Sequence, residues 1–184
     1  MSSFYKECQR IYEDRTKEHY HFLDYISDHS LFRNATENLQ LDVTLDTDIN
    51  DISTAFQSKL ESRIVDLQNA GFAVNRDDDG YLEISAVSAT YGFALECKLA
   101  FEQAEQQVID RLLHDLPEIT ESDFLEKANE GENKIRIPLF VKSLTSRIEK
   151  SIRGKYKFWT DQGFKVYVQA NYIQLSFKEK NKEV

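Results

Sequence analysis

Apolar residues along the chain follow two different periods, and their order indicates alternating strands and helices. Val43 and Leu45 alternate with polar neighbours, which is the period of a strand with one buried face. From Ile49 to Leu67 apolar residues recur at spacings of three and four, which is one face of an α-helix. Gly71 follows, where a left-handed residue commonly closes a helix. Alternation then resumes on both sides of NRDDDG, which predicts a β-hairpin.

The same order of periods recurs 92 positions later, which predicts an internal repeat. One residue is dropped in the second hairpin, where VQAN forms the turn. The coinciding pairs are Val43/Ile135, Leu45/Ile137, Ile49/Val141, Ile52/Leu144, Phe56/Ile148, Leu60/Ile152, Ile64/Tyr156, Leu67/Trp159, Gly71/Gly163, Phe72/Phe164, Val74/Val166, Tyr81/Tyr172, Leu82/Ile173, Ile84/Leu175 and Ser85/Ser176. Each copy reads β–α–β–β; the alternative is a chance alignment of two unrelated α+β stretches.

The segments around the two copies are predicted to be mainly helical. Residues 4–29 carry an apolar stripe at helical spacing. Residues 93–101 alternate strictly, which favours a third strand paired with residues 81–88. A continuous helix from residue 91 is the rival, because Ala, Leu and Glu are good helix formers. EQAEQQVIDRLLHDL is helical up to Pro117, and TESDFLEKANEG predicts a short capped helix.

Together these elements predict an α+β protein: a duplicated β-α-β-β module, or pseudo-twofold repeat, with an N-terminal helix and connecting helices. Pro138 cannot donate to a ladder, so its strand at 134–139 should be an edge strand or end there. The predicted organisation is an N-terminal helical segment (1–38), a first copy with the extra strand (39–101), a helical connector (102–132) and a second, basic copy (133–184).

The composition is that of a folded chain, with 184 residues of which 41% are hydrophobic. Cys8 and Cys97 have no CxxC partner, which predicts reduced thiols rather than a disulfide or zinc site. The N-terminus has no apolar run typical of a signal peptide, and no apolar stretch reaches about 18 residues. We therefore expect a soluble protein that has no membrane partner. Its expected location is the cytoplasm, or the host cytoplasm if a phage encodes it.

Charge is distributed unevenly along the chain, whose net charge is −9. Residues 133–184 hold 12 Lys+Arg and 4 Asp+Glu, a balance of +8, whereas residues 1–132 hold 11 and 28, a balance of −17. Residues 1–132 are thus acidic and residues 133–184 are basic. This asymmetry carries information about binding partners rather than about the fold.

Catalytic and cofactor signatures are missing from the sequence. There is no HExxH, GxSxG, Walker or GxGxxG pattern, and there are only 6 glycines and 4 histidines. The helix with Glu18, His21, Asp24 and Asp28 is better explained as a solvated acidic face than as a metal site. We therefore expect no enzyme of a recognisable class, no cofactor, no metal and no small-molecule ligand.

Two sets of acidic residues are candidate cation sites. NRDDDG begins like a calcium loop, but the twelfth position is Ala86, so a hairpin turn is the better interpretation. We name Asp77, Asp78 and Asp79 the acidic turn and retain it as a candidate binding site. A distant alternative is a metal-dependent enzyme in which Asp42, Asp46, Asp77 and Glu83 converge.

The second copy also predicts a basic helix over 141–159, with cations opposite its apolar face. Arg147, Lys150, Arg153 and Lys157, here named the basic stripe, recur at spacings of 3, 3 and 4. The stripe could bind phosphates, dock on the acidic surface of another copy, or remain a solvated face.

The leading hypothesis is a non-catalytic binding protein that is regulatory or assembly-related and acts through a protein partner or self-association. Sparse Gly and Pro with abundant Asp, Asn, Tyr and Phe are typical of a small acidic phage or mobile-element accessory or inhibitor protein. The alternative is a nucleic-acid-binding protein that uses the basic helix.

Overall fold

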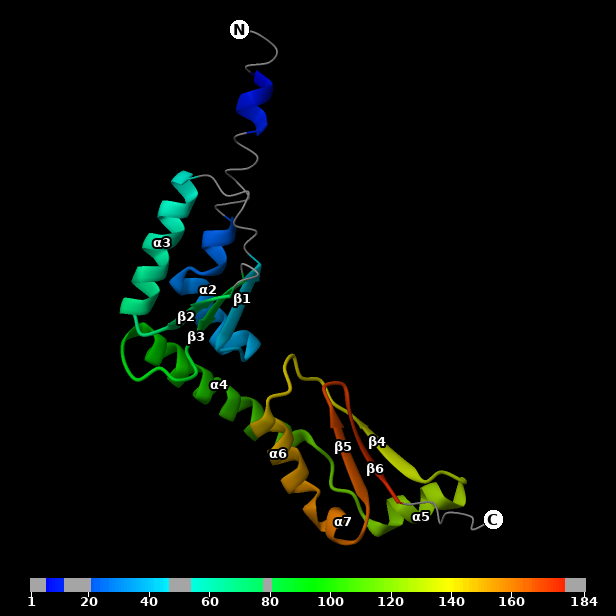
Figure 1. Cartoon of the computed structure of the whole chain (residues 1–184). Helices are drawn as coiled ribbons and strands as arrows, with labels where there is room; N and C mark the ends of the chain where they lie inside the picture. Colours follow the sequence, from blue (N-terminus) through cyan, green and yellow to red (C-terminus); the bar gives the residue numbers. More distant parts are fainter. Residues whose placement is uncertain (1–5, 12–20, 47–53, 78–80, 178–184) are drawn as a thin grey trace. The chain divides into compact units, whose positions relative to one another are not determined.

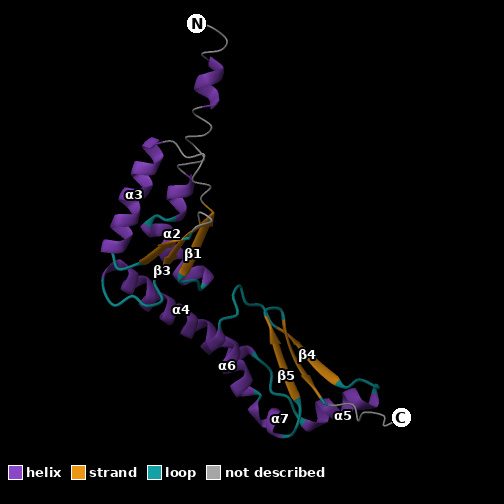
Figure 2. Cartoon of the chain, viewed as in Figure 1, coloured by secondary structure: helices purple, strands orange, loops and turns teal. Residues whose placement is uncertain are grey.

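The computed structural model describes residues 6–11, 21–46, 54–77 and 81–177 (Figures 1 and 2). The chain divides into two compact units, unit 1 with residues 1–104 and unit 2 with residues 105–184. Each unit combines helices with one three-stranded antiparallel sheet, which confirms the α+β class.

Unit 1 contains a sheet in which the two outer strands both pair with the last one. Its elements are α2 (Asp28–Arg33), the π-helix η1 (Asn34–Asn38), β1 (Asp42–Asp46), α3 (Thr54–Asn69), β2 (Ala73–Arg76), β3 (Tyr81–Ser85) and the start of α4 (Gly92–Asp115). The strand order is β1-β3-β2, and both β1 and β2 run antiparallel to β3. The strands joined by α3 are therefore parallel, with the third strand between them.

The core of unit 1 lies on one side of that sheet. Leu82 and Ile84 of β3 are fully buried and belong to the same cluster as Phe56, Leu60 and Leu67 of α3. Alternate residues of β3, Tyr81 and Glu83, are exposed. The two-residue period predicted for these strands thus separates a covered face from an open one.

The predicted N-terminal helix at 4–29 is interrupted before its end. Residues 6–11 and 21–25 are helical, and residues 12–20 lie outside the described chain. Ser27 has extended backbone, and its hydroxyl accepts a hydrogen bond from the Ser30 N–H at 3.3 Å, so a new helix, α2, begins at Asp28. A serine in this position caps a helix start, which the apolar period alone did not reveal.

The predicted third strand at 93–101 is wrong, because these residues form the first part of the 24-residue helix α4. Ala94 and Cys97 are buried, and Phe93 and Phe101 pack against the same core. Leu99, which the strand would have placed with them, is 55% exposed. Phe93, Cys97 and Phe101 are four residues apart, so their alternation also fits one helix face, and the helix formers between them decide the outcome.

Unit 2 contains the remainder of α4 and a second sheet with the order β4-β6-β5. Its elements are α5 (Glu121–Asn129), β4 (Lys134–Pro138), α6 (Ser146–Lys155), α7 (Lys157–Asp161), β5 (Lys165–Gln169) and β6 (Tyr172–Ser176). The predicted edge strand is confirmed, because β4 is an outer strand that ends at Pro138. The capped helix is confirmed too, with Thr120 and Asp123 forming a capping box.

The core of unit 2 combines aliphatic residues of α6 and β6 with a cluster of aromatic rings. Ile148 and Ile152 of α6 and Ile173 and Leu175 of β6 are almost completely buried. Next to them the rings of Phe124, Trp159 and Phe164 form a triangle, with centroids 4.3–5.2 Å apart. In Figure 1, α6 and α7 lie along one side of this sheet. Unit 2 therefore also has one covered and one open sheet face.

The basic helix predicted at 141–159 is shorter than its apolar stripe suggested. α6 begins at Ser146, with Thr145 as its N-cap, and the helix is interrupted at Tyr156 before α7. The Thr145 hydroxyl accepts a hydrogen bond from the Ile148 N–H at 3.2 Å. Val141, Lys142 and Leu144 consequently lie in the connection between β4 and α6.

Pairing registers are the same in both sheets when the sequence is shifted by 92 positions before the hairpin and 91 after it. Asp42 pairs with Ser85 in unit 1, and Lys134 pairs with Ser176 in unit 2. At the other edge Ala73 pairs with Ser85, and Lys165 pairs with Ser176.

Gly71 and Gly163 close the helices that precede β2 and β5, as their positions in the sequence predict. Their φ angles are +94° and +91°. The residue after each glycine donates its N–H five residues back, Phe72 to Leu67 O and Phe164 to Trp159 O, both at 3.0 Å. This pattern is the Schellman motif, which requires a left-handed residue and so favours glycine.

The two glycines differ in their surroundings, which yields the first testable prediction. A Cβ on Gly71 would lie 2.4 Å from the carbonyl oxygen of Tyr91, whereas a Cβ on Gly163 meets nothing within 4 Å. Gly163→Ala should lower the free energy of unfolding by about 1 kcal/mol, because alanine is strained in the left-handed backbone conformation. Gly71→Ala should lower the free energy of unfolding by about 1–3 kcal/mol more than Gly163→Ala does, because the backbone of Tyr91 also has to move. Urea unfolding of both variants measures the difference, and equal losses would contradict this account.

Candidate functional site

Arg147, the first cation of the basic stripe, is engaged inside unit 2. Its Nη1 donates to Glu105 Oε2 at 3.2 Å, and its Nη2 donates to Gln106 Oε1 at 2.5 Å. The hydroxyl of Thr145 donates to the other oxygen of Glu105 at 2.5 Å. Glu105 is only 4% exposed, so the hydrogen bonds from Arg147 and Thr145 replace those that water would make to its carboxylate. Arg147 is thus the ion-pair partner of a buried carboxylate within unit 2.

Two more cations of the stripe also have partners. Arg153 forms an ion pair with Glu149 at 2.7 Å and donates from Nη1 to the backbone oxygen of Val166 at 2.5 Å. Lys157 forms an ion pair with Asp161 at 2.6 Å. Lys150 is exposed and makes no ion pair with the described residues. Three of the four predicted binding cations are therefore already paired within unit 2.

Lys155, which adds to the charge of the same helix, closes the end of another helix. Its Nζ donates to the backbone oxygens of Leu113 and Leu116 at 2.6 and 2.7 Å. The hydroxyl of Tyr156 donates to the oxygen of Pro117 at 3.0 Å. A cation at the C-terminal end of α4 satisfies carbonyl groups that have no partner within the helix.

The acidic turn is described only at Asp77, because Asp78 and Asp79 lie outside the described residues. The N–H of Asp77 donates to the oxygen of Tyr81 at 3.0 Å, and its Oδ1 accepts the N–H of Tyr81 at 2.7 Å. The carboxylate of Asp77 therefore closes the hairpin, as a turn aspartate commonly does.

Within the described parts of the chain, no three His, Cys, Asp or Glu side chains lie close enough to hold a metal ion. Of the four carboxylates of the metal-dependent alternative, Asp42 and Glu83 lie on the open face of the unit 1 sheet. Asp77 is engaged in the hairpin, and the side chain of Asp46 lies outside the described part.

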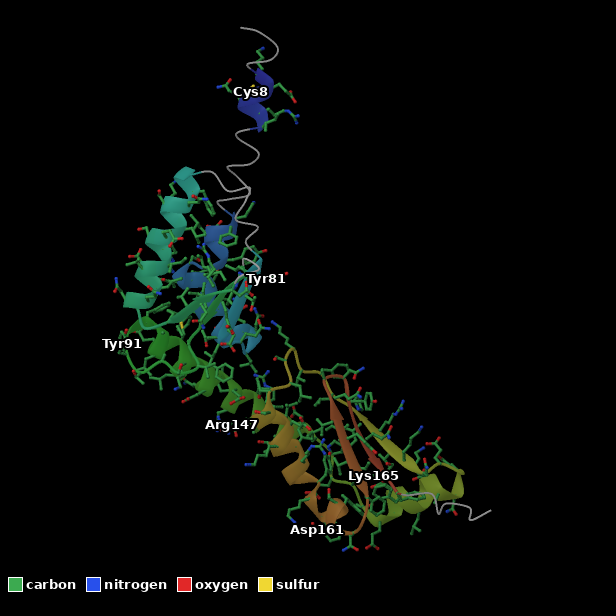
Figure 3. All side chains as sticks on the ribbon, in the orientation of Figure 1. Cys8, Tyr81, Tyr91, Arg147, Asp161 and Lys165 are labelled. Atoms are coloured by element: carbon green, nitrogen blue, oxygen red, sulfur yellow. The ribbon has the colours of Figure 1, made fainter. Side chains whose placement is uncertain are left out.

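The open face of the unit 2 sheet is cationic, and helical-wheel reasoning missed it. The register places its nine side chains in three rows across β4, β6 and β5, and we name them the basic sheet face: Lys134, Ser176 and Lys165; Arg136, Gln174 and Tyr167; Pro138, Tyr172 and Gln169. None of the nine is acidic. Figure 3 labels Lys165 on this sheet and Arg147 and Asp161 on the helices of the same unit.

Arg136 is held in place in the middle row of the basic sheet face, on the outer strand β4. Its Nε donates to Gln174 Oε1 at 2.9 Å, and its Cζ lies 5.0 Å from the centre of the Tyr172 ring. This distance is in the range of a cation–π contact. A guanidinium stacked on an aromatic ring is a flat, cationic platform whose orientation is fixed before any ligand arrives.

The corresponding sheet face of unit 1 carries the opposite charge. The outward residues of its sheet, here named the acidic sheet face, are Asp42, Ser85 and Ala73 in one row, Thr44, Glu83 and Asn75 in the next, and Tyr81. No cation is among them, and Arg76 instead pairs with Glu61 of α3 at 3.1 Å. Asp42 thus corresponds to Lys134, and Glu83 corresponds to Gln174.

The two units also differ in their total charge, because unit 1 is strongly acidic and unit 2 is nearly neutral. Residues 1–104 hold 9 Lys+Arg and 19 Asp+Glu, a balance of −10, whereas residues 105–184 hold 14 and 13, a balance of +1. A strongly acidic unit attracts cationic surfaces and repels polyanions over about 8–10 Å at moderate salt.

The two cysteines lie in different environments. Cys8 is exposed, and Cys97 is buried. Burial, followed by the nearby charges of Asp28 and Glu96, raises the pKa of the Cys97 thiol to about 11. Because the thiolate is the reactive form, Cys97 is a packing residue rather than a nucleophile.

No described helix is both long and apolar enough to cross a membrane. Comparison with protein-family models, curated proteins and solved structures finds no match to the chain.

The buried carboxylate of Glu105 yields a prediction about the basic stripe. Arg147→Ala should lower the free energy of unfolding by about 1–2 kcal/mol, because Glu105 loses its ion pair while remaining buried. Lys150→Ala removes the same charge from the same helix and should change stability by less than about 0.5 kcal/mol. Urea denaturation measures both, and similar effects would mean that the Arg147–Glu105 pair contributes nothing.

The raised pKa of Cys97 predicts a loss of stability at alkaline pH. From pH 9, the usual thiol pKa, to about 11 the unfolded chain releases this proton while the folded chain keeps it, so rising pH favours unfolding. Between pH 8 and 10.5 the wild-type protein should therefore lose more unfolding free energy than Cys97→Ala. Cys8→Ala is the control and should follow the wild type, and a Cys97→Ala variant with the same pH dependence would contradict the assignment.

Proposed function

We propose that the protein is a non-catalytic binding protein, regulatory or assembly-related, that acts through the acidic surface of unit 1. The observation that carries this proposal is the acidic sheet face. Asp42 and Glu83 are exposed there and form no hydrogen bond or ion pair with the described residues. Unpaired carboxylates on a regular sheet are free to meet cations of a partner.

The proposal includes the duplicated β-α-β-β module. Equal strand order and equal register at a shift of 92 positions support it, as does the Schellman glycine in each unit. Two modules with similar buried faces and oppositely charged open faces provide one chain with two distinct binding surfaces.

A partner of unit 1 should present a basic surface. The balance of −10 in residues 1–104 speeds the approach of such a partner and disfavours acidic ones. Around the carboxylates, Tyr81, Asn75 and Thr44 supply ring area and hydrogen-bonding groups, which protein interfaces use. In the sequence, the three carboxylates of the acidic turn directly follow β2 and add to the negative charge of unit 1.

Carboxylates arranged on a rigid sheet resemble the phosphates of a nucleic acid in charge. A protein that binds nucleic acid through a basic groove is therefore a partner of suitable chemistry, and occupation of its groove would inhibit it. This mode of action fits the hypothesis of a small phage or mobile-element inhibitor.

The proposal predicts that binding is lost when the acidic sheet face is neutralised. Asp42→Asn with Glu83→Gln should weaken binding at least tenfold, because charge pairs across an interface are removed. Immobilised full-length protein would be used to capture partners at about 100 mM salt, and binding of each purified partner would then be measured calorimetrically. Partners should be basic and should bind more weakly as salt rises.

The matched control is Asp66→Asn with Glu102→Gln, which removes the same charge from exposed positions on α3 and α4. Its binding should remain within about threefold of the wild type. If both double variants bind as the wild type does, or if the captured partners are acidic, the acidic sheet face is not the binding surface.

A further inference from the structure

We propose that the basic sheet face of unit 2 binds single-stranded nucleic acid. The face carries Lys134, Arg136 and Lys165, and its two tyrosines lie among these cations in the rows set by the register. None of its nine residues is acidic, so nothing on the face itself repels a phosphate. A polyanion is therefore the complementary ligand in charge.

The two lysines of this face are available for phosphate binding, in contrast to three of the four cations of the basic stripe. Lys134 and Lys165 are exposed and make no ion pair with the described residues. They stand at opposite edges of one row, separated by Ser176 of the central strand. Their Cα atoms are thus two strand spacings apart, about 10 Å, so that a backbone crossing the sheet can meet both.

The aromatic residues supply the second requirement, which is a surface for bases. Tyr167 is 46% exposed, and Tyr172 carries the guanidinium of Arg136 above its ring. Flat aromatic and guanidinium groups both stack on unpaired bases, whatever their sequence. Gln169 and Gln174 add amide groups able to hydrogen-bond base edges.

A single strand suits this face better than a duplex. The bases of a duplex are stacked on one another, so their flat surfaces cannot reach Tyr167 or the Arg136–Tyr172 pair. The three strands are only five residues long, and among the described residues of β4, β5 and β6 this face presents strand side chains rather than a helix that could enter a major groove. Three strands of five residues measure about 14 Å by 17 Å, which suits two or three stacked bases.

The experiment measures binding of the full-length protein to a fluorescein-labelled 15-nucleotide oligo(dT) by fluorescence anisotropy between about 25 and 200 mM salt. Three phosphate contacts on a single strand predict a slope of about −2 for log K against log salt. Lys134→Gln with Lys165→Gln should reduce that slope to about −0.7, because one contact remains, and should weaken binding at least tenfold at the lowest salt.

Tyr167→Ala separates base stacking from electrostatics. Loss of one stacked base should weaken binding about tenfold while leaving the salt slope unchanged. The matched control is Lys150→Gln with Lys157→Gln, which removes two charges from the helices and should leave affinity within about twofold. Circular dichroism of each variant establishes that it is folded.

Several outcomes would overturn the proposal. If the helix double variant loses binding while the sheet variants retain it, the basic stripe is the nucleic-acid site. Binding of a duplex of equal length as tightly as the single strand would remove the role of stacking. No binding to oligo(dT), together with a salt-sensitive molar mass by light scattering that Lys134→Gln with Lys165→Gln abolishes, would identify a second copy of this chain as the occupant. The acidic sheet face is intact in all these variants, so the outcome is independent of the protein-binding function of unit 1.

Discussion

Coverage of only one side of each sheet is the constraint on which the rest of the structure depends. Side chains of a strand alternate between two faces, so burial of Leu82 and Ile84 or of Ile173 and Leu175 forces their neighbours into solvent. Helices supply the apolar partners on one side, through α3 in unit 1 and α6 in unit 2. The other side is open in both units, and it is there that the chain presents regular arrays of polar groups.

Sequence periodicity predicted most of the fold because these sheets are buried on one side only. Alternation at 43–45, 82–84 and 173–175 marks strands correctly. The same alternation gave a wrong strand prediction at Phe93, Cys97 and Phe101, because residues four apart share a helix face as well as a strand face. Periodicity also missed the helix break at Ser27, since a capping serine interrupts the backbone without changing the apolar stripe.

The candidate site was harder to predict because charge along a helix says nothing about tertiary partners. Arg147 meets Glu105, which is 42 residues away, and Arg153 meets the backbone of Val166. Neither contact leaves a local pattern in the sequence. The cations of the basic sheet face did leave one, since Lys134 and Arg136 occupy the polar positions of an alternating strand. Examining the polar half of each predicted strand, as well as the apolar half, would have found them.

The two sheets can carry opposite charges on their open faces because inward and outward positions face different constraints. The inward positions of the two sheets must stay apolar, because a charge there would be buried without a partner. The outward positions contribute little to stability, because a solvated side chain there has few packing contacts. Asp42 can therefore stand where Lys134 stands, and Asn75 where Tyr167 stands, with no change in strand order or register. The same strand order and pairing register thus support an acidic sheet face in unit 1 and a basic, aromatic sheet face in unit 2.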